Sequence, residues 1–371
     1  MAVDVGRIVR WMESWAPAEL AEPDDKIGLQ IGSMRAPVER VAVALDVTDA
    51  VVEEAIERGA KLIIAHHPIL FRPLTAIRTD RPDGKLLRKL LLNDIAVYAS
   101  HTNLDVAVGG VNDLLAEALG LEGTKPLKIT NVETLYKLAT YVPPSHEDAV
   151  REAVFAAGAG HIGNYSHCGF TLEGEGTFLP EAGARPFAGE LGTLERAAER
   201  RFETIVPEGR KDAVVKALLA AHPYEEVAYD LYRLELAGRE FGLGRIGTLP
   251  RTMELRAFAE HAKAAFGVPT LRYVGEPSAP IRKVAVLGGS GRSFVKHAIR
   301  AGADAFVTGD LDHHTAHDAL AAGLALVDPG HHIEQIMKAA VAGRLAAVAE
   351  AEGWGVEAYA SVGSTEPFAF L

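Results

Sequence analysis

The 371-residue sequence has a single cysteine, Cys168, and it lacks long apolar runs. One thiol excludes disulfide frameworks, cysteine-rich zinc sites and iron–sulfur clusters held by this chain alone, and it is typical of a reducing compartment. No run of about 18 apolar residues occurs, and charges interrupt the short apolar stretches at the N-terminus, so neither a transmembrane helix nor a signal peptide is expected. We therefore predict a soluble, cytoplasmic protein.

Positive charge is also scarce. Lysine and arginine number 38 against 50 aspartates and glutamates, which gives a formal net charge of −12. This balance argues against a general affinity for nucleic acid or for anionic membranes, because both attract basic surfaces. The net charge does not exclude a small anionic ligand that is bound by local groups. The length predicts two or three domains.

An internal repeat organises the two ends of the chain. The segment Arg40–Pro68 aligns without gaps on Lys283–Leu311, and each copy has the pattern of a strand, a helix and a strand. The two helices are expected to stop at Gly59 and Gly302, since glycine favours the helix C-terminus. Thr48 is a candidate N-cap. Alternating strands and helices predict a largely parallel sheet covered by helices, with ligands beyond the carboxyl ends of the strands.

The middle of the chain has a repeat of its own. The segment that begins at Leu138 resembles the segment that begins at Phe202, and each reads as a strand, a turn marked by proline and an amphipathic helix. This order predicts a ferredoxin-like α+β domain. The predicted organisation is therefore two related α/β modules that form one core domain, residues 1–129 and 239–371, interrupted by an inserted domain at 130–238.

Histidines cluster after the predicted buried strands. Eight of the 14 fall in three places: His66 and His67; His101; and His313, His314, His317, His331 and His332. Loops at strand ends of an α/β sheet commonly carry functional groups. The clustering therefore points to a site rather than to solvated surface histidines.

Two carboxylates accompany these histidines at equivalent places in the repeat. Asp105 follows a strand of the first module, and Glu334 occupies the matching place in the second. Imidazole and carboxylate donors together suit zinc, manganese, iron or cobalt. His331 precedes Glu334 by three residues, so both share one face if this stretch is helical. Adjacent residues on a strand point to opposite sides, so His66 and His67 either need an irregular strand end to converge or serve different metals.

Other features allow two interpretations each. His101, His313, His314 and His317 favour roles in contact with ligands or substrate, or on a helix surface, over direct metal binding. Asp310 is either a hydrogen-bond acceptor for a metal-binding histidine or half of an ordinary Gly-Asp turn. The stretch Gly288–Arg292, GGSGR, either cradles a phosphate or forms a tight turn.

The motifs together resemble the family of GTP cyclohydrolase I type 2 homologues, in its long form. They include AHHPILF at Ala65, SHTNLDVAVGGVND at Ser100, HPYEEVAYD at His222, TGDLDHHTAHDAL at Thr308 and DPGHHIE at Asp328. The resemblance implies two divalent metal ions per chain, with zinc favoured and manganese, iron or cobalt as alternatives, bound by His66, His67, Asp105, His331 and Glu334. It also implies a homohexamer and an insert similar to PII and CutA proteins.

Two functions follow from this resemblance. The first is a metal-dependent hydrolase that acts on a nucleotide or a related substrate, with His101 or His314 transferring protons or contacting substrate. The second is a non-catalytic metal-binding regulatory or scaffold protein, in which the PII-like insert senses a ligand or contacts a partner. A fold alone does not decide between them.

Overall fold

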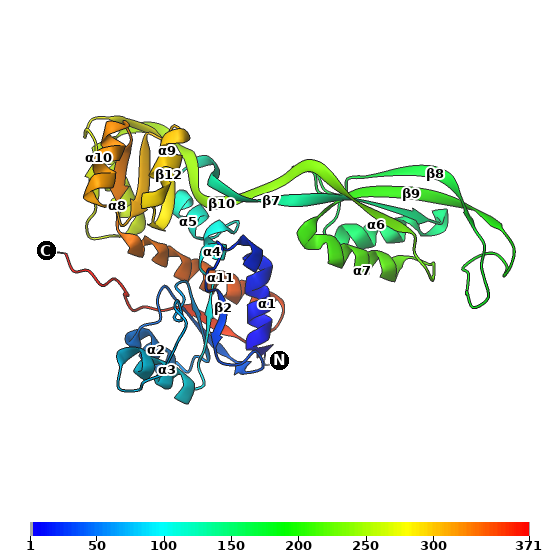
Figure 1. Cartoon of the computed structure of the whole chain (residues 1–371), viewed down its shortest axis with the longest axis horizontal. Coiled ribbons are helices and arrows are strands. Elements are labelled where there is room, and N and C mark those ends of the chain that lie inside the picture. The colour runs from blue at the N-terminus through cyan, green and yellow to red at the C-terminus, as the bar shows by residue number, and fades with distance from the viewer. Residues whose placement is uncertain (1–2, 371) are drawn as a thin grey trace. The chain divides into compact units, whose positions relative to one another are not determined.

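The computed structural model describes residues 3–370 as a mixed α/β structure with several sheets (Figure 1). The chain divides into two compact units. The larger comprises Met1–Asn131 and Phe241–Leu371, and the smaller comprises Val132–Glu240. The boundaries predicted from the sequence were 129/130 and 238/239.

The first half of the larger unit is built on a five-stranded sheet. Its strands are β2 (Gly28–Ile31), β4 (Arg40–Ala44), β5 (Leu62–Ala65), β6 (Ala96–Ala99) and β15 (Glu357–Ala360), in the order β15-β4-β5-β6-β2. Neighbours from β15 to β6 run parallel, whereas the edge strand β2 runs antiparallel to β6. A separate two-stranded antiparallel pair joins β1 (Val3–Asp4) to β3 (Pro37–Val38).

The helices of this half include one whose start and end the sequence predicted. They are α1 (Val5–Trp15), η1 (Ala18–Leu20), α2 (Asp49–Glu57), α3 (Pro82–Leu92), α4 (Thr102–Val106) and α5 (Val111–Ala118). The Thr48 side chain accepts a hydrogen bond from the Val51 backbone N–H, which confirms it as the N-cap of α2. Gly59 follows the helix with a φ of 70°, a conformation that glycine adopts without a steric cost.

The second half contributes five strands to a second sheet, which has eight strands in all. The five strands are β10 (Tyr229–Glu254), β11 (Arg272–Val274), β12 (Pro280–Ser290), β13 (Ala305–Gly309) and β14 (Ala325–Asp328). β12, β13 and β14 run parallel, and β10 and β11 flank them antiparallel. The sequence predicted a largely parallel sheet. The parallel strands instead form two separate sheets, and each sheet also includes antiparallel strands.

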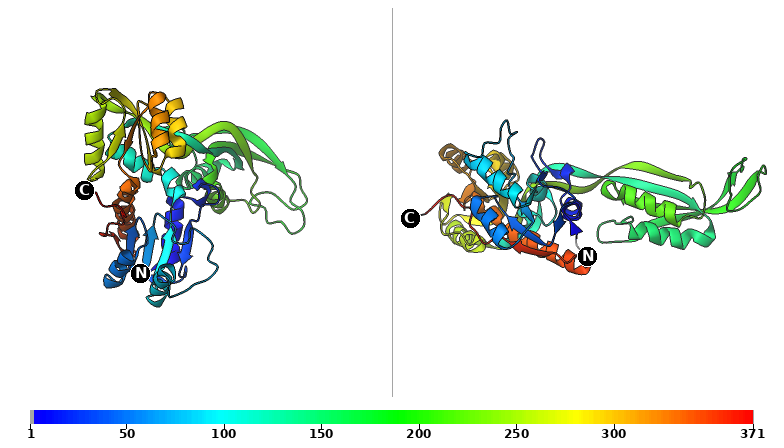
Figure 2. Two further views of the ribbon diagram at one scale, coloured as in Figure 1. Left: turned by 60° about the vertical axis from the view of Figure 1, so that its left-hand side comes forward. Right: turned by 90° about the horizontal axis from the view of Figure 1, so that it is seen from below.

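Helices pack on both sheets and share the main core. The remaining helices of this unit are α8 (Leu255–Phe266), η4 (Arg292–Phe294), α9 (Val295–Arg300), α10 (His313–Ala321), η5 (His331–Gln335) and α11 (Ile336–Ala351). α11 contacts β4 and β15 of the first sheet and α5, and it follows η5 directly (Figures 1 and 2). Buried Val341 and Leu345 of α11 therefore belong to the same hydrophobic core as Val41 of β4 and Phe306 of β13.

The smaller unit has the element order strand, helix, strand, strand, helix, strand. Its elements are β7 (Glu122–Val142), η2 (Pro144–His146), α6 (Glu147–Ala156), β8 (Gly169–Phe178), β9 (Glu195–Pro207), η3 (Glu208–Arg210), α7 (Lys211–Ala221) and the start of β10. β9 lies between β7 and β8 and runs antiparallel to both. Its core includes Leu138, Val154, Phe202, Val214 and Leu218. Its assignment as ferredoxin-like stays a prediction.

Candidate metal centre

His66 and His67 come from the carboxyl end of β5. Their backbone N–H groups donate to the carbonyls of Ala44 and Leu45, at 3.1 and 2.9 Å, so the backbone stays hydrogen-bonded to the neighbouring strand just past the end of β5. The two imidazole centroids are 5.1 Å apart and the rings are tilted by 47°. The side chains therefore lie side by side beyond the strand, each with its own set of neighbours.

The second half contributes His331 and Glu334 from η5. Residues three apart share a face in a 3-10 helix, which brings His331 Nε2 to 3.2 Å from a carboxylate oxygen of Glu334. The expected shared face is therefore confirmed, in a 3-10 helix rather than an α-helix. Gly330 precedes the helix with a φ of 90° and turns the chain sharply after Asp328, the last residue of β14.

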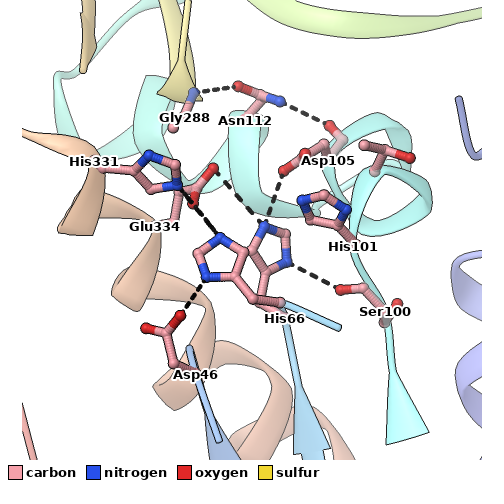
Figure 3. A network of polar contacts seen from close by, with 12 residues as sticks. Asp46, His66, Ser100, His101, Asp105, Asn112, Gly288, His331 and Glu334 are labelled. Atoms are coloured by element: carbon pink, nitrogen blue, oxygen red, sulfur yellow. Dashed lines mark hydrogen bonds and ion pairs between the residues drawn. The ribbon is translucent and has the colours of Figure 1, made fainter. Parts of the chain in front are cut away.

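One group of potential ligands is fully buried. His66 Nε2 lies 3.7 Å from a carboxylate oxygen of Asp105 and 3.8 Å from one of Glu334 (Figure 3). Neither His66 Nε2 nor Asp105 Oδ1 has a hydrogen-bond partner among the described residues. Unpaired buried polar atoms are costly, and these distances are too long for a direct hydrogen bond. A cation bound between the three side chains would satisfy both atoms.

A second group shares Glu334. His67 Nε2 lies 3.1 Å from a carboxylate oxygen of Glu334, and His331 Nε2 lies 3.4 Å from His67 Nε2. The three ligand atoms lie within 4.8 Å of one another, as do those of the first group. Glu334 can thus offer one oxygen to each group (Figure 3).

Carboxylates fix the orientation of both histidines in the second group. His67 Nδ1 donates to Asp46 at 2.7 Å, and His331 Nδ1 donates to Asp310 at 2.8 Å. These bonds leave the Nε2 lone pairs of the two rings facing each other and the Glu334 carboxylate. Such a convergence of lone pairs needs a proton or a metal between them, and a carboxylate behind each histidine is the usual arrangement around a protein-bound metal. His66 is held similarly, by the Ser100 carbonyl at 3.0 Å.

Without a bound metal, the close packing of these groups shifts their pKa values. Burial acts to lower the pKa of His67, but hydrogen bonds to Asp46 and Glu334 raise it to about 10. The hydrogen bond to Glu334 raises the pKa of His331 to about 9. Burial raises the pKa of Asp105 to about 6, whereas the surrounding histidines hold the pKa of Glu334 well below its ordinary value despite burial. The metal-free site therefore holds protons that a cation would displace.

His101 stands at the edge of the same cluster. Its ring centroid is 5.1 Å from that of His66 and 5.6 Å from that of His67, and a ring nitrogen lies within 4.8 Å of ligand atoms of both. His101 Nδ1 donates to Asp25 at 2.9 Å, and Thr102 also donates to this carboxylate. These hydrogen bonds help to hold the pKa of Asp25 well below its ordinary value despite burial. Nε2 is thereby left as the acceptor that can face the cluster.

Asp105 is linked to the end of β12 through the side-chain amide of Asn112. Asn112 donates to the Asp105 carbonyl at 3.0 Å and accepts from the Gly288 N–H at 3.0 Å (Figure 3). A side chain on Gly288 would meet Glu334 at 3.0 Å, and one on Gly289 would meet it at 2.6 Å. Gly288 and Gly289, at the end of β12, are therefore the place where the backbone approaches Glu334.

Gly289→Ala tests this close approach. Gly289 has a φ of 61°, and an added Cβ would lie 2.6 Å from Glu334 Oε1 and 3.3 Å from His331 Nε2. We expect a loss of about 1–2 kcal/mol of stability from the left-handed backbone and, in addition, a clear loss of bound metal because Glu334 must move. Gly302→Ala is the control, since its φ of 69° imposes the same strain in open space. Equal metal content in the two variants, measured by elemental analysis, would contradict the prediction.

The structure brings five predicted ligands together and places other predicted residues elsewhere. His66, His67, Asp105, His331 and Glu334 lie in the groups described above, and His101 lies beside them. His314 lies exposed on α10 and belongs to none of these groups. His332 points to the Thr365 hydroxyl, at 3.3 Å. The roles of all these residues stay predictions.

Sequence reasoning missed the residues behind the ligands. Asp25 and Asp46 were not singled out, although Asp46 lies two residues after the end of β4, at the same edge of the sheet as His66. Asp310 was left open, and both interpretations apply, because it accepts from His331 and also has a φ of 57°. Thr365 donates to Asp46 at 2.6 Å from a segment without regular structure. No spacing in the sequence indicates that contact.

Fold and site together define a class: an α/β protein of two related halves, with a cluster of histidines and carboxylates drawn from both. The family model of Duf34/NIF3 (NGG1p interacting factor 3) matches residues 3–367, and the chain belongs to this family. Within residues 3–370, no helix combines the length and apolar character that a membrane span requires.

Relatives in sequence and in structure agree with this assignment. The chain is 52% identical over 364 residues to a Halalkalibacterium halodurans protein named GTP cyclohydrolase 1 type 2 homolog, with 98% of each chain covered. It is 51% identical over 370 residues to the Bacillus subtilis protein of that name, with 100% of this chain and 99% of the relative covered. The crystal structure of a Bacillus cereus protein related to NIF3 superimposes with a TM-score of 0.94 at 50% identity, covering 99% of both chains.

Proposed function

We propose that this protein binds two divalent metal ions and uses them to hydrolyse a nucleotide or a related substrate. The observation that carries the proposal is the sharing of Glu334 between two groups of ligand atoms. His66, Asp105 and Glu334 would hold one ion, and His67, His331 and Glu334 the other. The mixed imidazole and carboxylate donors favour zinc, with manganese, iron or cobalt as alternatives.

A pair of such ions supplies a water molecule with a lowered pKa and a template for the substrate. His101 is the residue of this chain best placed to move a proton there. Asp25 holds its Nδ1–H, so Nε2 can accept a proton near the cluster and the aspartate then stabilises the imidazolium. The neighbouring Thr102 hydroxyl and N–H keep Asp25 in place.

A cavity of about 280 Å³ adjoins the centre at Asp46 and His67. Its other walls are mostly apolar, from residues that include Ile69, Leu74 and Leu86, and the described residues that line it include no lysine or arginine. Its size suits a small ring better than a whole nucleoside triphosphate. We therefore place the ring of the substrate here, with any phosphate outside the cavity.

A nucleotide panel tests the proposal. Protein loaded with two metals per chain is expected to release phosphate, formate or nucleoside from at least one member, and His101→Gln is expected to slow that reaction by roughly 10²- to 10⁴-fold without loss of metal. His161→Gln is the control, because His161 is exposed in the smaller unit. Loaded protein that turns over no member would favour the non-catalytic regulatory role. The homohexamer and a PII-like sensing role of the smaller unit remain predictions from the resemblance.

A further inference from the structure

Helix α10 carries three exposed histidines that the proposed centre does not use. His313, His314 and His317 are all exposed, and within residues 3–370 none of their side chains has a hydrogen bond or an ion pair. An unpaired exposed imidazole is ordinary by itself. Here, however, three exposed imidazoles lie within five residues of one helix with their rings in contact, so several potential metal ligands lie close together.

Two of these rings lie close enough together for one ion to bind both. His313 and His317 are four residues apart, so they lie on the same face of the helix one turn apart. Their ring centroids are 4.5 Å apart, with the planes at 71°. His314 lies one residue further round the helix, and its ring centroid is 5.6 Å from that of His313. The closer pair is therefore His313 and His317.

The helix start that carries this pair is fixed by other groups. Asp312 is the N-cap and accepts from the Thr315 N–H at 2.8 Å, while its other oxygen accepts from Arg292 at 2.8 Å. Because these contacts fix the start of the helix, the two imidazoles lose less conformational entropy when they bind one ion. Asp312 is engaged in these contacts, so the ligand pair consists of imidazoles alone.

We propose that His313 and His317 form a third metal site on the chain, separate from the centre at Glu334. Two imidazoles without a carboxylate favour borderline transition metals, so we expect Cu²⁺ to bind first and Ni²⁺ and Zn²⁺ more weakly. With two protein ligands, water fills the remaining positions, and the ion exchanges readily with solution. Two histidines at this spacing are a recurrent helical motif for metal binding.

Copper titration of the full-length protein tests the site. The protein is first loaded with zinc, its zinc content is measured, and Cu²⁺ is then added while binding is followed by calorimetry and by electron paramagnetic resonance. We expect one Cu²⁺ with nitrogen hyperfine structure in addition to any copper that exchanges for zinc, and this exchange is counted by measuring the zinc released. His317→Gln and His313→Gln should each weaken this binding by roughly tenfold or more.

Two further variants decide the assignment. His161→Gln removes an exposed histidine elsewhere and should leave copper binding unchanged, and His314→Gln should weaken it by less than threefold. Unchanged binding in both His313→Gln and His317→Gln would overturn the proposal, and a tenfold loss in His314→Gln would contradict the assigned pair. Gel filtration before copper is added removes zinc from the weak site on α10, so the zinc that remains reports on the centre at Glu334. Failure of one proposal is therefore distinguishable from failure of the other.

Discussion

Glu334→Gln is expected to remove both metal ions from the proposed centre. The amide keeps the shape of the side chain but has only one acceptor oxygen and no charge, whereas the carboxylate lies within reach of both ligand groups. Loss of an outer hydrogen-bond partner costs roughly 10- to 100-fold in metal affinity, so loss of a shared ligand should cost about 100-fold or more at each position. Elemental analysis of the purified variant should then find close to no bound metal.

A second substitution separates the two positions. Asp105→Asn affects only the group that contains His66, so one ion per chain should remain. Glu350→Gln removes an exposed carboxylate from α11 and should leave two ions bound. Two bound ions in both Glu334→Gln and Asp105→Asn would refute the ligand assignment. One remaining ion in Glu334→Gln would show that Glu334 is not shared.

Removal of metal is expected to lower the melting temperature, and the difference should grow with pH. A ligand present at 1,000 times its dissociation constant stabilises the folded state by about 4 kcal/mol. At about 2–4 °C per kcal/mol for a unit of this size, the chelated protein should melt roughly 8–16 °C below the loaded protein. Differential scanning calorimetry with and without a chelator measures this difference.

The sign of the pH effect follows from the two histidines whose pKa is raised in the metal-free protein. The stability that protonated His67 and His331 contribute is fully present below about pH 6.5, their unfolded pKa, and is lost as pH rises through about 9 and 10. Metal binding displaces these protons, so apparent affinity should rise by roughly 100-fold per pH unit for two protons.

Calorimetry at pH 6.5, 7.5 and 8.5 should therefore show a widening gap between loaded and chelated protein. The Glu334→Gln variant is the control and should melt at the same temperature with and without the chelator at each pH. A gap in the unaltered protein that stays constant over this range would mean that metal binding releases no protons.

The local elements of the larger unit were predictable because each one depends on neighbouring residues. Thr48 caps α2, and Gly59 ends it with a positive φ, as turn and cap preferences require. β5 was evident as a short, wholly apolar run between two polar stretches. The spacing of His331 and Glu334 likewise indicated a shared helical face, whichever helix type formed.

Contacts between distant segments were not predictable in the same way. Asp46 contacts His67 and Thr365 contacts Asp46, and each contact joins segments whose relative placement depends on the packing of the whole unit. A single aspartate after a strand has no pattern that distinguishes it from a turn residue. The directions of the edge strands β2 and β11 were not predictable either, because both strands are short and have no periodicity that sets their direction.

The ligands of the proposed centre join parts of the chain that are far apart, and this has a consequence for folding. His67 and His331 are separated by 264 residues, and their Nε2 atoms are 3.4 Å apart. A metal that both bind would close a loop of that length, as a disulfide would, and cross-links across long loops restrict the unfolded chain by several kcal/mol, about 4.7 for 100 residues. With only Cys168, the chain has no disulfide of its own. The metal pair would thus act as a cross-link that reductants leave intact and chelators open, and that forms only after both halves have been synthesised.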